Sequence, residues 1–340
     1  MRYVITGGSG YIGSRLVDVL SRREDTKRIV ICDVTPPRIY KPKTQFEHVD
    51  VRDRKRMRAV IESAQPDAIA HLAFIFNPIH DEELMYDVDV NGTHNVLESA
   101  AEAGTPQVLV ITSVAAYGAH PDNPVPLTEE DPVRGVAGFS YARDKTESDR
   151  ICQLWAAQHP DRIMTIVRPC IVFGPNVDNY ILRLWTKQPF VADVGTLDNQ
   201  LQFVHEDDVV EAISRLLLGR HAGAFNLAGE GVMTSRECAE LLGTPIRKMP
   251  LRAYRGLATA MWRLRVSESP PGSVDFNLYP WVISNEKLKR TLDWTPRYTS
   301  RETFEITMRA NGKLPAAEAP PTGEPPTSAP ATEPAASAAP

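Results

Sequence analysis

The feature that most limits the fold of this chain is an alternation of short strand-like runs and longer helix-like stretches up to about residue 173. β-branched and apolar runs occur at 3–6, 28–33, 68–73, 108–113 and 162–167. Between them, apolar residues recur at helical spacing over 12–20, 55–63 and 84–103. Such alternation is typical of parallel strands connected by helices that cover both faces of a sheet. The sequence therefore predicts an α/β fold with a doubly wound parallel sheet.

The alternation loosens after residue 173, and the composition changes again near residue 313. Residues 174–312 hold more loops and shorter elements, which indicates a smaller C-terminal substrate lobe with some segments returning to the sheet. Residues 315–340 contain no aromatic residue and no Leu, Ile or Val, so they cannot bury enough apolar surface to offset the entropy lost on ordering. We therefore expect a sheet domain at 1–173, the substrate lobe at 174–312 and a disordered tail at 313–340.

The overall charge argues against nucleic acid as a partner. The 340 residues carry a formal net charge of −5 and a pI of about 5.9, and the lysines and arginines are scattered along the chain. No basic field is therefore available to attract a phosphate backbone. A small molecule is the expected partner.

The cysteines and the hydropathy pattern bear on the compartment. The four cysteines, at positions 32, 152, 170 and 238, form no CxxC pair and no cluster with histidine. Neither a disulfide framework nor a metal site is expected, and a reducing cytoplasm suits such a chain. The sequence starts directly in strand-like residues, MRYVITGG, and has no run of about 18 apolar residues, so neither export nor a membrane span is expected.

A glycine-rich turn lies between the first strand and the first helix, in VITGGSGYIGSRLV at 4–17. Gly7, Gly10 and Gly13 permit a tight turn and close backbone approach, and the helix N-terminus adds amide donors and partial positive charge for a pyrophosphate. Asp33 ends the next strand, where a carboxylate binds the adenosine ribose hydroxyls and repels a 2′-phosphate. This context predicts a Rossmann-type domain that binds NAD in preference to NADP.

A second local pattern is FSYARDK at 139–145, which spaces Tyr141 and Lys145 four residues apart. On one helical turn the two side chains project from the same face. The pair by itself fits either a solvated surface pair or a proton-transfer device. A free tyrosine titrates near pH 10, but a neighbouring ammonium and a cationic nicotinamide favour its phenolate, so the dinucleotide context favours proton transfer.

Taken in order, these and further motifs resemble the extended short-chain dehydrogenase/reductase family, in its NAD-dependent epimerase/dehydratase branch, and within it the UDP-glucose 4-epimerases. The resemblance runs from residue 1 to about residue 310. The matching pieces are TGGSGYIG (6–13), DVRD (50–53), HLA (71–73), VNGTHNVLESA (90–100), ITSVAAYG (111–118), YARDK (141–145), RPCIVFGP (168–175), FVHEDDVVEAI (203–213) and LDWTP (292–296).

The resemblance implies a catalytic set of three side chains and a series of cofactor contacts. Tyr141 would be the acid and base, Lys145 would bind the nicotinamide ribose, and Ser113 would orient the substrate, with Thr112 as the alternative in the neighbouring register. The further NAD contacts implied are Tyr11 and Ile12 at the pyrophosphate turn, Asp50 and Val51 at the adenine, Leu72 and Ala73 after the fourth strand, Asn91 on the neighbouring helix, and Pro169 at the nicotinamide.

Several of these contacts have a second interpretation. Val51, Leu72 and Ala73 could simply be core residues. Asn91 could instead satisfy backbone groups close to it.

Two departures from the family pattern bear on the reaction and the substrate. Dehydratases of this branch have an acidic pair just before the Tyr-Gly of the ITSVAAYG piece, and decarboxylases keep a glutamate there. This chain has Val114, Ala115 and Ala116 instead. Water elimination needs an added acid and base, so a dehydratase is not expected.

The second departure concerns the diphosphate of a nucleotide-sugar. Nucleotide-sugar epimerases usually carry an arginine just before FVHxxD, where it binds that diphosphate. Here Leu201 and Gln202 stand at this place. A two-point, charge-assisted contact is therefore lost unless Arg183, Arg255 or Arg263 replaces it.

The segment 251–266, LRAYRGLATAMWRLRV, mixes four arginines with apolar residues at near-helical spacing. It fits a lobe helix packed on the core, a lid over an apolar substrate, or a helix lying on a membrane surface. All three interpretations stay open on the sequence.

Three functions are consistent with these patterns. The leading hypothesis is a redox-neutral, NAD-dependent epimerase of a sugar or nucleotide-sugar that works through a transient ketone. The second is a dehydrogenase or reductase of an apolar, steroid-like alcohol or ketone, favoured by the missing arginine and by the segment 251–266. The third is a dinucleotide-sensing regulator without catalysis, which the intact Tyr141 and Lys145 disfavour.

The resemblance also implies a homodimer, formed by the helical stretches around 84–103 and 141–158. The candidate apolar residues for the dimer face are Leu84, Val88, Val96, Leu97, Ile151, Leu154 and Trp155. The same residues could equally face the sheet.

Overall fold

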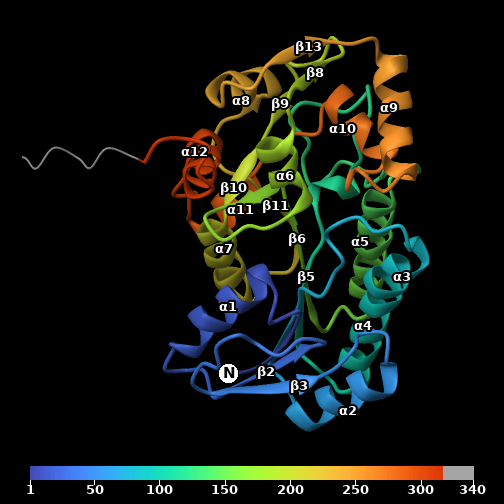
Figure 1. Cartoon of the computed structure of the whole chain (residues 1–340). Coiled ribbons are helices and arrows are strands. Elements are labelled where there is room, and N and C mark those ends of the chain that lie inside the picture. The colour runs from blue at the N-terminus through green and yellow to red at the C-terminus, as the bar shows by residue number, and fades with distance from the viewer. Residues whose placement is uncertain (317–340) are drawn as a thin grey trace, which may run out of the picture.

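A seven-stranded parallel sheet forms the centre of the molecule (Figure 1). The computed structural model describes residues 1–316, and its strands lie in the order β11-β6-β5-β4-β1-β2-β3. Their bounds are β1 (Arg2–Thr6), β2 (Arg28–Asp33), β3 (Thr44–His48), β4 (Ala68–His71), β5 (Gln107–Ile111), β6 (Ile163–Pro169) and β11 (Gly223–Leu227). All neighbouring pairs are parallel. Because the chain winds outward from β1 in both directions, the predicted doubly wound α/β fold is confirmed.

Helices cover both faces of this sheet because successive strand residues point to opposite sides. The helices are α1 (Tyr11–Ser21), α2 (Arg54–Ala64), α4 (Gly92–Glu102), α5 (Ser140–Gln158) and α7 (Glu206–Gly219). Tyr3 and Ile5 of β1 pack with the apolar faces of α1 and α7. Val4, on the other face of the same strand, packs with α2, α4 and α5. Each face of the sheet thus has its own apolar core.

The helical region that leads into α4 is continuous but not regular. The periodicity predicts one helix over 84–103, but α3 (Glu82–Tyr86) is joined to α4 by a wider helical turn over Asp87–Asn91. Wide turns of this kind occur frequently at functional sites. Asp89 is fully buried within this turn, whereas Asn91 is exposed.

The second lobe consists of short strand pairs and short helices, and it lies above the sheet in Figure 1. The strands pair as β7 (Ile171–Phe173) with β10 (Phe203–His205), β8 (Val191–Asp193) with β13 (Ile246–Lys248), and β9 (Gln200–Leu201) with β12 (Met233–Thr234). The helices are α6 (Tyr180–Lys187), α8 (Ser235–Leu241), α9 (Leu251–Arg263), α10 (Asp275–Leu278), α11 (Glu286–Leu292) and α12 (Ser300–Ala310). Stacked rings of Phe173, Phe203 and Phe304 lie at its centre.

Two elements from the second half of the chain return to the first sheet. β11 extends the sheet beside β6, and α7 packs against α1.

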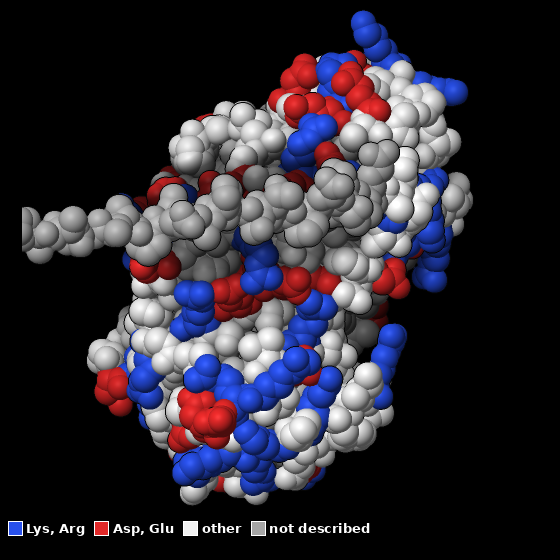
Figure 2. Space-filling model, turned by 90° about the vertical axis from the view of Figure 1, so that its left-hand side faces the viewer, with Lys and Arg blue, Asp and Glu red and all other residues white. Residues whose placement is uncertain are grey.

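Basic and acidic side chains are intermixed over the face that carries α1, α7, α8 and α12 (Figure 2). Arg15 of α1, for example, forms ion pairs with Glu206 and Asp207 of α7.

Three of the residues expected at a dimer face are part of the protein's own core. Val96, Leu97 and Trp155 are at most 3% exposed and pack on the sheet, whereas Leu154 is 64% exposed.

Within residues 1–316, no helix has the length and apolarity needed to cross a membrane. The tail expected at 313–340 lies outside the described residues from position 317 onward.

Candidate active site

One cavity of about 1070 Å³ runs from the glycine-rich turn, past the carboxyl ends of the strands, into the second lobe. The carboxyl edge beside β1 and β4, where the winding reverses, is the usual binding crevice of such sheets. The predicted residues that line the cavity are Gly7, Gly10, Tyr11, Ile12, Gly13, Asp33, Asp50, Val51, Leu72, Ala73, Ser113, Tyr141, Lys145 and Pro169. Asn91 is not among them.

The glycine-rich turn is closed by short backbone contacts that leave no room for side chains. Gly7 has a φ of 66°, and its carbonyl accepts a hydrogen bond from the Gly10 N–H at 3.0 Å. A Cβ atom on Gly13 would lie 2.1 Å from the Gly7 carbonyl oxygen, and one on Gly7 would lie 2.7 Å from the backbone of Leu72 and Ala73. These positions therefore require glycine.

The first turn of α1 is open to a ligand. Gly10 is its N-cap, and no side chain among the described residues caps the helix there. The amide donors and partial positive charge of the N-terminus consequently face the cavity. An anionic pyrophosphate suits this position.

Asp33 lies at the end of β2, on the cavity wall next to this turn. Its carboxylate accepts hydrogen bonds from the N–H groups of Ser9 and Thr35, both at 3.0 Å. These two donors fix its orientation toward the cavity, where a ribose diol would find an acceptor. The glycine cradle, the open helix end and this carboxylate together fit an adenine dinucleotide.

The two residues attributed to the adenine end line the cavity, whereas Asn91, expected to contact NAD from the neighbouring helix, does not. Asp50 and Val51 line the cavity, and the guanidinium of Arg52 lowers the pKa of the Asp50 carboxyl. Asn91 instead donates from its side-chain amide to Asp87 at 2.9 Å, on the exposed side of the wide turn. Its partner is therefore a nearby side chain rather than the backbone groups of the alternative interpretation.

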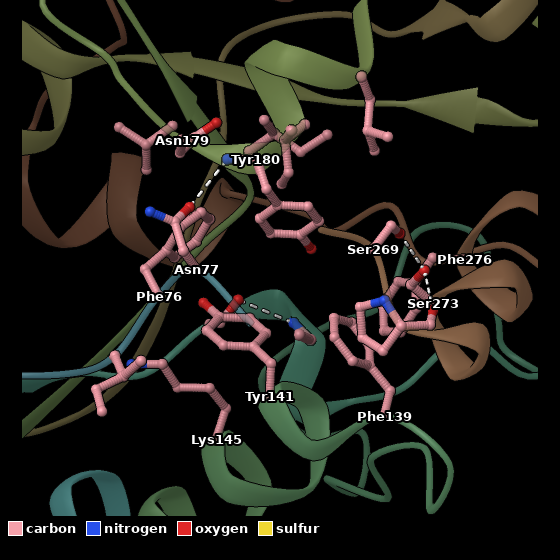
Figure 3. Close-up of a pocket in the computed structure, with 18 of the residues that line it drawn as sticks. Phe76, Asn77, Phe139, Tyr141, Lys145, Asn179, Tyr180, Ser269, Ser273 and Phe276 are labelled. Carbon is pink, nitrogen blue, oxygen red and sulfur yellow. Dashed lines mark hydrogen bonds between the residues drawn. The ribbon is translucent and has the colours of Figure 1, made fainter. Parts of the chain in front are cut away.

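The cavity has a cofactor half beside the glycine-rich turn and a substrate half in the second lobe, and Tyr141 and Lys145 lie where the two halves join (Figure 3). Ser113 lines the cavity at the same junction. Ser113 follows β5, and its hydroxyl accepts from the Ala115 N–H at 3.1 Å. Tyr141 and Lys145 both come from the first turns of α5. Thr112 has its hydroxyl engaged with the Asp149 carboxylate at 2.9 Å, so Ser113 is the hydroxyl available to a substrate.

Burial makes both ionised forms of the Tyr141–Lys145 pair costly. Tyr141 is 6% exposed, and burial raises the pKa of its phenol, with the hydrogen bond to Ser113 opposing that shift. Lys145 donates to the Ile111 carbonyl at 3.1 Å, and its Nζ lies 3.1 Å from the centre of the Phe74 ring. Burial lowers its pKa. A further charge in the cavity would therefore shift the pKa values of both groups strongly.

Asp89 is a titratable neighbour of Lys145 that sequence reasoning missed. Its side chain is fully buried, and one carboxylate oxygen accepts from the Ile75 N–H at 2.7 Å. The other carboxylate oxygen has no hydrogen-bond partner within residues 1–316. Burial raises the pKa of Asp89, and the Lys145 ammonium opposes that shift. In the sequence DVDVNG nothing marks this aspartate, because only the wide turn directs it inward.

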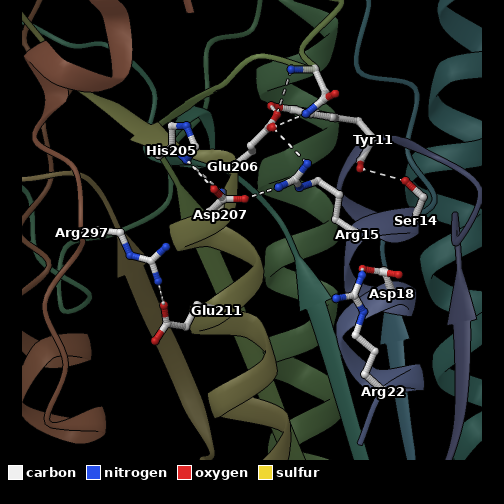
Figure 4. A network of polar contacts seen from close by, with 11 residues as sticks. Tyr11, Ser14, Arg15, Asp18, Arg22, His205, Glu206, Asp207, Glu211 and Arg297 are labelled. Carbon is white, nitrogen blue, oxygen red and sulfur yellow. Dashed lines mark hydrogen bonds and ion pairs between the residues drawn. The ribbon is translucent and has the colours of Figure 1, made fainter. Parts of the chain in front are cut away.

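A polar network connects the glycine-rich turn to the second lobe (Figure 4). The Tyr11 phenol donates to the carboxylate of Glu206, which is 1% exposed, and Arg15 pairs with the same carboxylate. Asn176 also donates to Glu206, from its side-chain amide at 2.5 Å. Tyr11 thus has a structural role at its hydroxyl, in addition to its ring lining the cavity.

The part of the cavity beyond Tyr141 is mostly apolar. Val114, Ala115 and Ala116 form a short buried turn with no acidic side chain. Aromatic and aliphatic residues from several elements complete this part of the wall, namely Phe76, Phe139, Tyr180, Ile181, Leu184, Trp185, Phe190, Leu197, Leu257, Met261, Phe276 and Trp281. Among residues 1–316, the lining of this part contains no pair of acids suited to water elimination.

Comparison with known proteins gives consistent results. The model of the NAD dependent epimerase/dehydratase family matches residues 3–228. The N-acetyl-α-D-glucosaminyl-diphospho-ditrans,octacis-undecaprenol 4-epimerase of Escherichia coli O157:H7 is 27% identical over 226 residues, which cover 65% of this chain and 64% of that protein.

Two solved structures have the same fold. The Bordetella bronchiseptica enzyme WbmG, in complex with NAD and UDP, superposes with a TM-score of 0.70 at 20% identity and covers 92% of this chain and 94% of its own. The UDP-glucose 4-epimerase of Thermotoga maritima, with UDP-glucose, has a TM-score of 0.70 at 19% identity and covers 92% and 99% of the two chains. At this identity the two structures support the fold rather than a particular substrate.

Proposed function

Because this chain belongs to the NAD dependent epimerase/dehydratase family, we propose that it is an NAD-dependent enzyme that inverts one hydroxyl-bearing carbon of a sugar. The reaction passes through a transient ketone and leaves no net redox change. The observation that carries this proposal is the meeting of Ser113, Tyr141 and Lys145 on the same cavity as the glycine-rich turn. The E. coli relative named above is likewise a 4-epimerase.

The cofactor half of the cavity has the groups that a dinucleotide needs. Gly7, Gly10 and Gly13 with the N-terminus of α1 would hold the pyrophosphate, and Asp33 would accept from the adenosine ribose. NAD, when bound there, supplies a hydride acceptor and a positive charge on the nicotinamide.

Each of the three catalytic side chains has a distinct task in this proposal. Tyr141 takes the proton of the substrate hydroxyl at its phenolic oxygen and returns it when the alcohol is restored. Lys145 stabilises the phenolate electrostatically and donates to the nicotinamide ribose. Ser113 donates to the substrate oxygen and aligns it with Tyr141.

The turn Val114–Ala116 favours epimerisation over dehydration. All three side chains are apolar and at most 5% exposed, so no second acid or base borders the substrate from this side. An epimerase needs none, because the same tyrosine serves both directions of proton transfer.

The experiment that tests the proposal is incubation of the purified protein with NAD and candidate sugars, followed by NMR of the sugar carbons. Appearance of an epimer with no change in NADH absorbance supports it. Stoichiometric formation of NADH together with a released ketone would contradict redox neutrality.

That second outcome is the signature of the alternative function, a net dehydrogenase or reductase of an apolar alcohol or ketone. The observation that favours this alternative is the predominance of apolar side chains in the cavity beyond Tyr141. Both functions use Tyr141, Lys145 and NAD in the same roles. They differ in whether the ketone is reduced again before it leaves.

Three further features complete the proposal. Residues 1–173 with the returning β11 form the cofactor-binding unit, and 174–312 form the substrate lobe. The chain forms a homodimer through the α4–α5 side, where Leu154 is 64% exposed. The enzyme works in the cytoplasm, which agrees with four buried cysteines that form no disulfide among residues 1–316.

A further inference from the structure

The substrate half of the cavity contains no cationic side chain among the described residues. Lys145 and Arg52 line the cavity, but they belong to the nicotinamide and adenine ends of the cofactor half. Beyond Tyr141 the one charged lining residue in the described part of the chain is Asp178, whose side chain is 90% exposed. A diphosphate entering this space would lose its hydration and find no charge-assisted partner.

The residues that could have supplied such a charge are engaged elsewhere. Gln202 uses both ends of its side-chain amide on the backbone of Ile283, at 2.7 and 3.0 Å, and does not line the cavity. Arg183 pairs with Glu268 and, at 2.6 Å, with Asp178 at the cavity wall, and Arg255 pairs with Asp275 at 2.9 Å. Neither arginine lines the cavity, and Arg263 does not line it either.

Helix α9 forms an apolar wall of this half. Tyr254, Leu257, Ala258 and Met261 line the cavity at helical spacing. No residue of α9 is buried, although its apolar side faces the lumen. A helix that presents four apolar side chains to a cavity and buries none of them has apolar area available for a ligand.

The remaining polar groups around this half are neutral. Tyr180 projects its phenol toward the lumen near Tyr141, and Ser269 and Ser273 lie on the same wall with their hydroxyls 2.7 Å apart (Figure 3). Neutral hydroxyl and amide groups suit the hydroxyls of a sugar ring. Apart from Lys145, which belongs to the cofactor half, the described groups at the junction are therefore neutral and polar, and the space toward α9 is apolar.

We propose that the substrate of this enzyme is a neutral glycoside whose apolar aglycone lies against α9, and that a nucleoside diphosphate is not the group this half of the cavity recognises. The proposal rests on the proposed function only for the position of the reacting hydroxyl at Tyr141. The sugar ring occupies the polar junction, and the hydrocarbon part fills the space lined by Leu257, Ala258 and Met261.

The test is a calorimetric titration of the NAD-loaded protein with hexyl, heptyl and octyl glucoside below their micelle concentrations, and with UDP-glucose. If the chain is buried against α9, each added methylene lowers the Kd about fourfold. UDP-glucose should bind at least about tenfold more weakly than octyl glucoside. Tighter binding of UDP-glucose, with an affinity that falls steeply with salt, would overturn the proposal.

A matched pair of variants on α9 locates the site. Ala258 lines the cavity, whereas Ala260 is exposed and does not. Ala258→Asp should weaken octyl glucoside at least about tenfold, because a carboxylate in the apolar wall must be desolvated by the ligand. Ala260→Asp adds the same charge two residues away and should change the affinity less than about twofold. Equal effects of the two variants would contradict the site on α9.

NAD binding and melting temperature serve as fold controls for both variants. The outcomes also separate this proposal from the proposed function. Epimerisation of UDP-glucose would support the proposed epimerase activity and contradict the proposed substrate class. Tight glucoside binding that depends on chain length, without formation of any epimer, would support the proposed binding site on α9 and contradict the epimerase activity.

Discussion

The Arg168 guanidinium and the Asp149 carboxylate form a two-point ion pair inside the protein, with both N–O distances 2.8 Å and neither side chain more than 2% exposed. Arg168 belongs to β6, and Asp149 lies on α5 one turn after Lys145. The Thr112 hydroxyl and the Gln153 amide also donate to Asp149, at 2.9 and 2.7 Å, and Arg168 donates to the Tyr117 phenol at 2.7 Å. This pair therefore fixes the catalytic helix to the sheet.

Removing one charge of this pair should be strongly destabilising. Asp149→Asn leaves the Arg168 charge buried without its counterion, which costs about 3–5 kcal/mol. Urea denaturation followed by circular dichroism measures the loss. Asp161→Asn, whose carboxylate is 76% exposed, is the control and should cost less than about 1 kcal/mol. A loss below about 1 kcal/mol for Asp149→Asn would show that the pair contributes little.

Tyr141→Phe should abolish most of the turnover while sparing the fold and NAD binding. The substitution removes the acid and base but keeps the ring that packs against Phe76 and Phe139. General acid–base catalysis contributes about 10²–10⁴-fold, and kcat should fall by that factor. Tyr180→Phe removes a phenol from the same cavity and should cost at most about tenfold, the size of one neutral hydrogen bond. Retention of half the turnover by Tyr141→Phe would reject the assigned proton donor.

Lys145→Ala and Ser113→Ala should separate cofactor binding from substrate alignment. Lys145→Ala loses turnover and also weakens NAD, because its ammonium serves both the phenolate and the ribose. Ser113→Ala lowers turnover with NAD affinity unchanged, because the partner of its hydroxyl is the substrate. Fluorescence titration of NAD and steady-state rates measure the two effects. Equal NAD affinity in both variants would show that Lys145 makes no ribose contact.

NAD should bind more tightly than NADP because of Asp33. Its carboxylate is held in place by the N–H groups of Ser9 and Thr35, and a 2′-phosphate would meet it as a like charge. Asp33→Asn keeps the shape of the side chain and removes its charge, so the ratio of the Kd for NADP to the Kd for NAD should decrease. Titration of both cofactors against both proteins is the measurement. Similar affinities of the unmodified protein for NAD and NADP would refute this role.

His71 should make the fold sensitive to acid. Its imidazole is fully buried between Thr6 and Thr93, at 2.6 and 3.0 Å, and burial lowers its pKa to about 3. Between about pH 6.5 and that value, the unfolded chain binds a proton that the folded protein does not. The free energy of unfolding therefore falls as the pH falls, by about 1.4 kcal/mol per unit.

Denaturation at pH 7, 6 and 5 measures this slope. His71→Gln should reduce the slope of the free energy of unfolding against pH. The same substitution at the exposed His48 should leave that slope unchanged. An identical slope in the unmodified protein and His71→Gln would show that His71 is not responsible.

The sequence alone determined the features that depend on neighbours along the chain. Strand and helix periodicity requires only residues two to four positions apart, and it predicted β1, β2, β4, β5 and β6 at their observed places. The glycine-rich turn is equally local, since Gly7 and Gly13 lie six residues apart and touch through the backbone. The motif order then related Ser113, after β5, and Tyr141 with Lys145, both on α5, to a known family scaffold.

Only the tertiary structure decided which polar groups face the site and which charges are used elsewhere. Asp89 points inward and Asn91 outward because the wide helical turn changes which residues face the core. A pattern with 3.6 residues per turn does not predict this change. Gln202 meets Ile283, and Tyr11 meets Glu206, across 81 and 195 residues of sequence. Such contacts depend on how packed elements bring distant residues together, and the same packing leaves no cationic side chain of residues 1–316 lining the substrate half of the cavity.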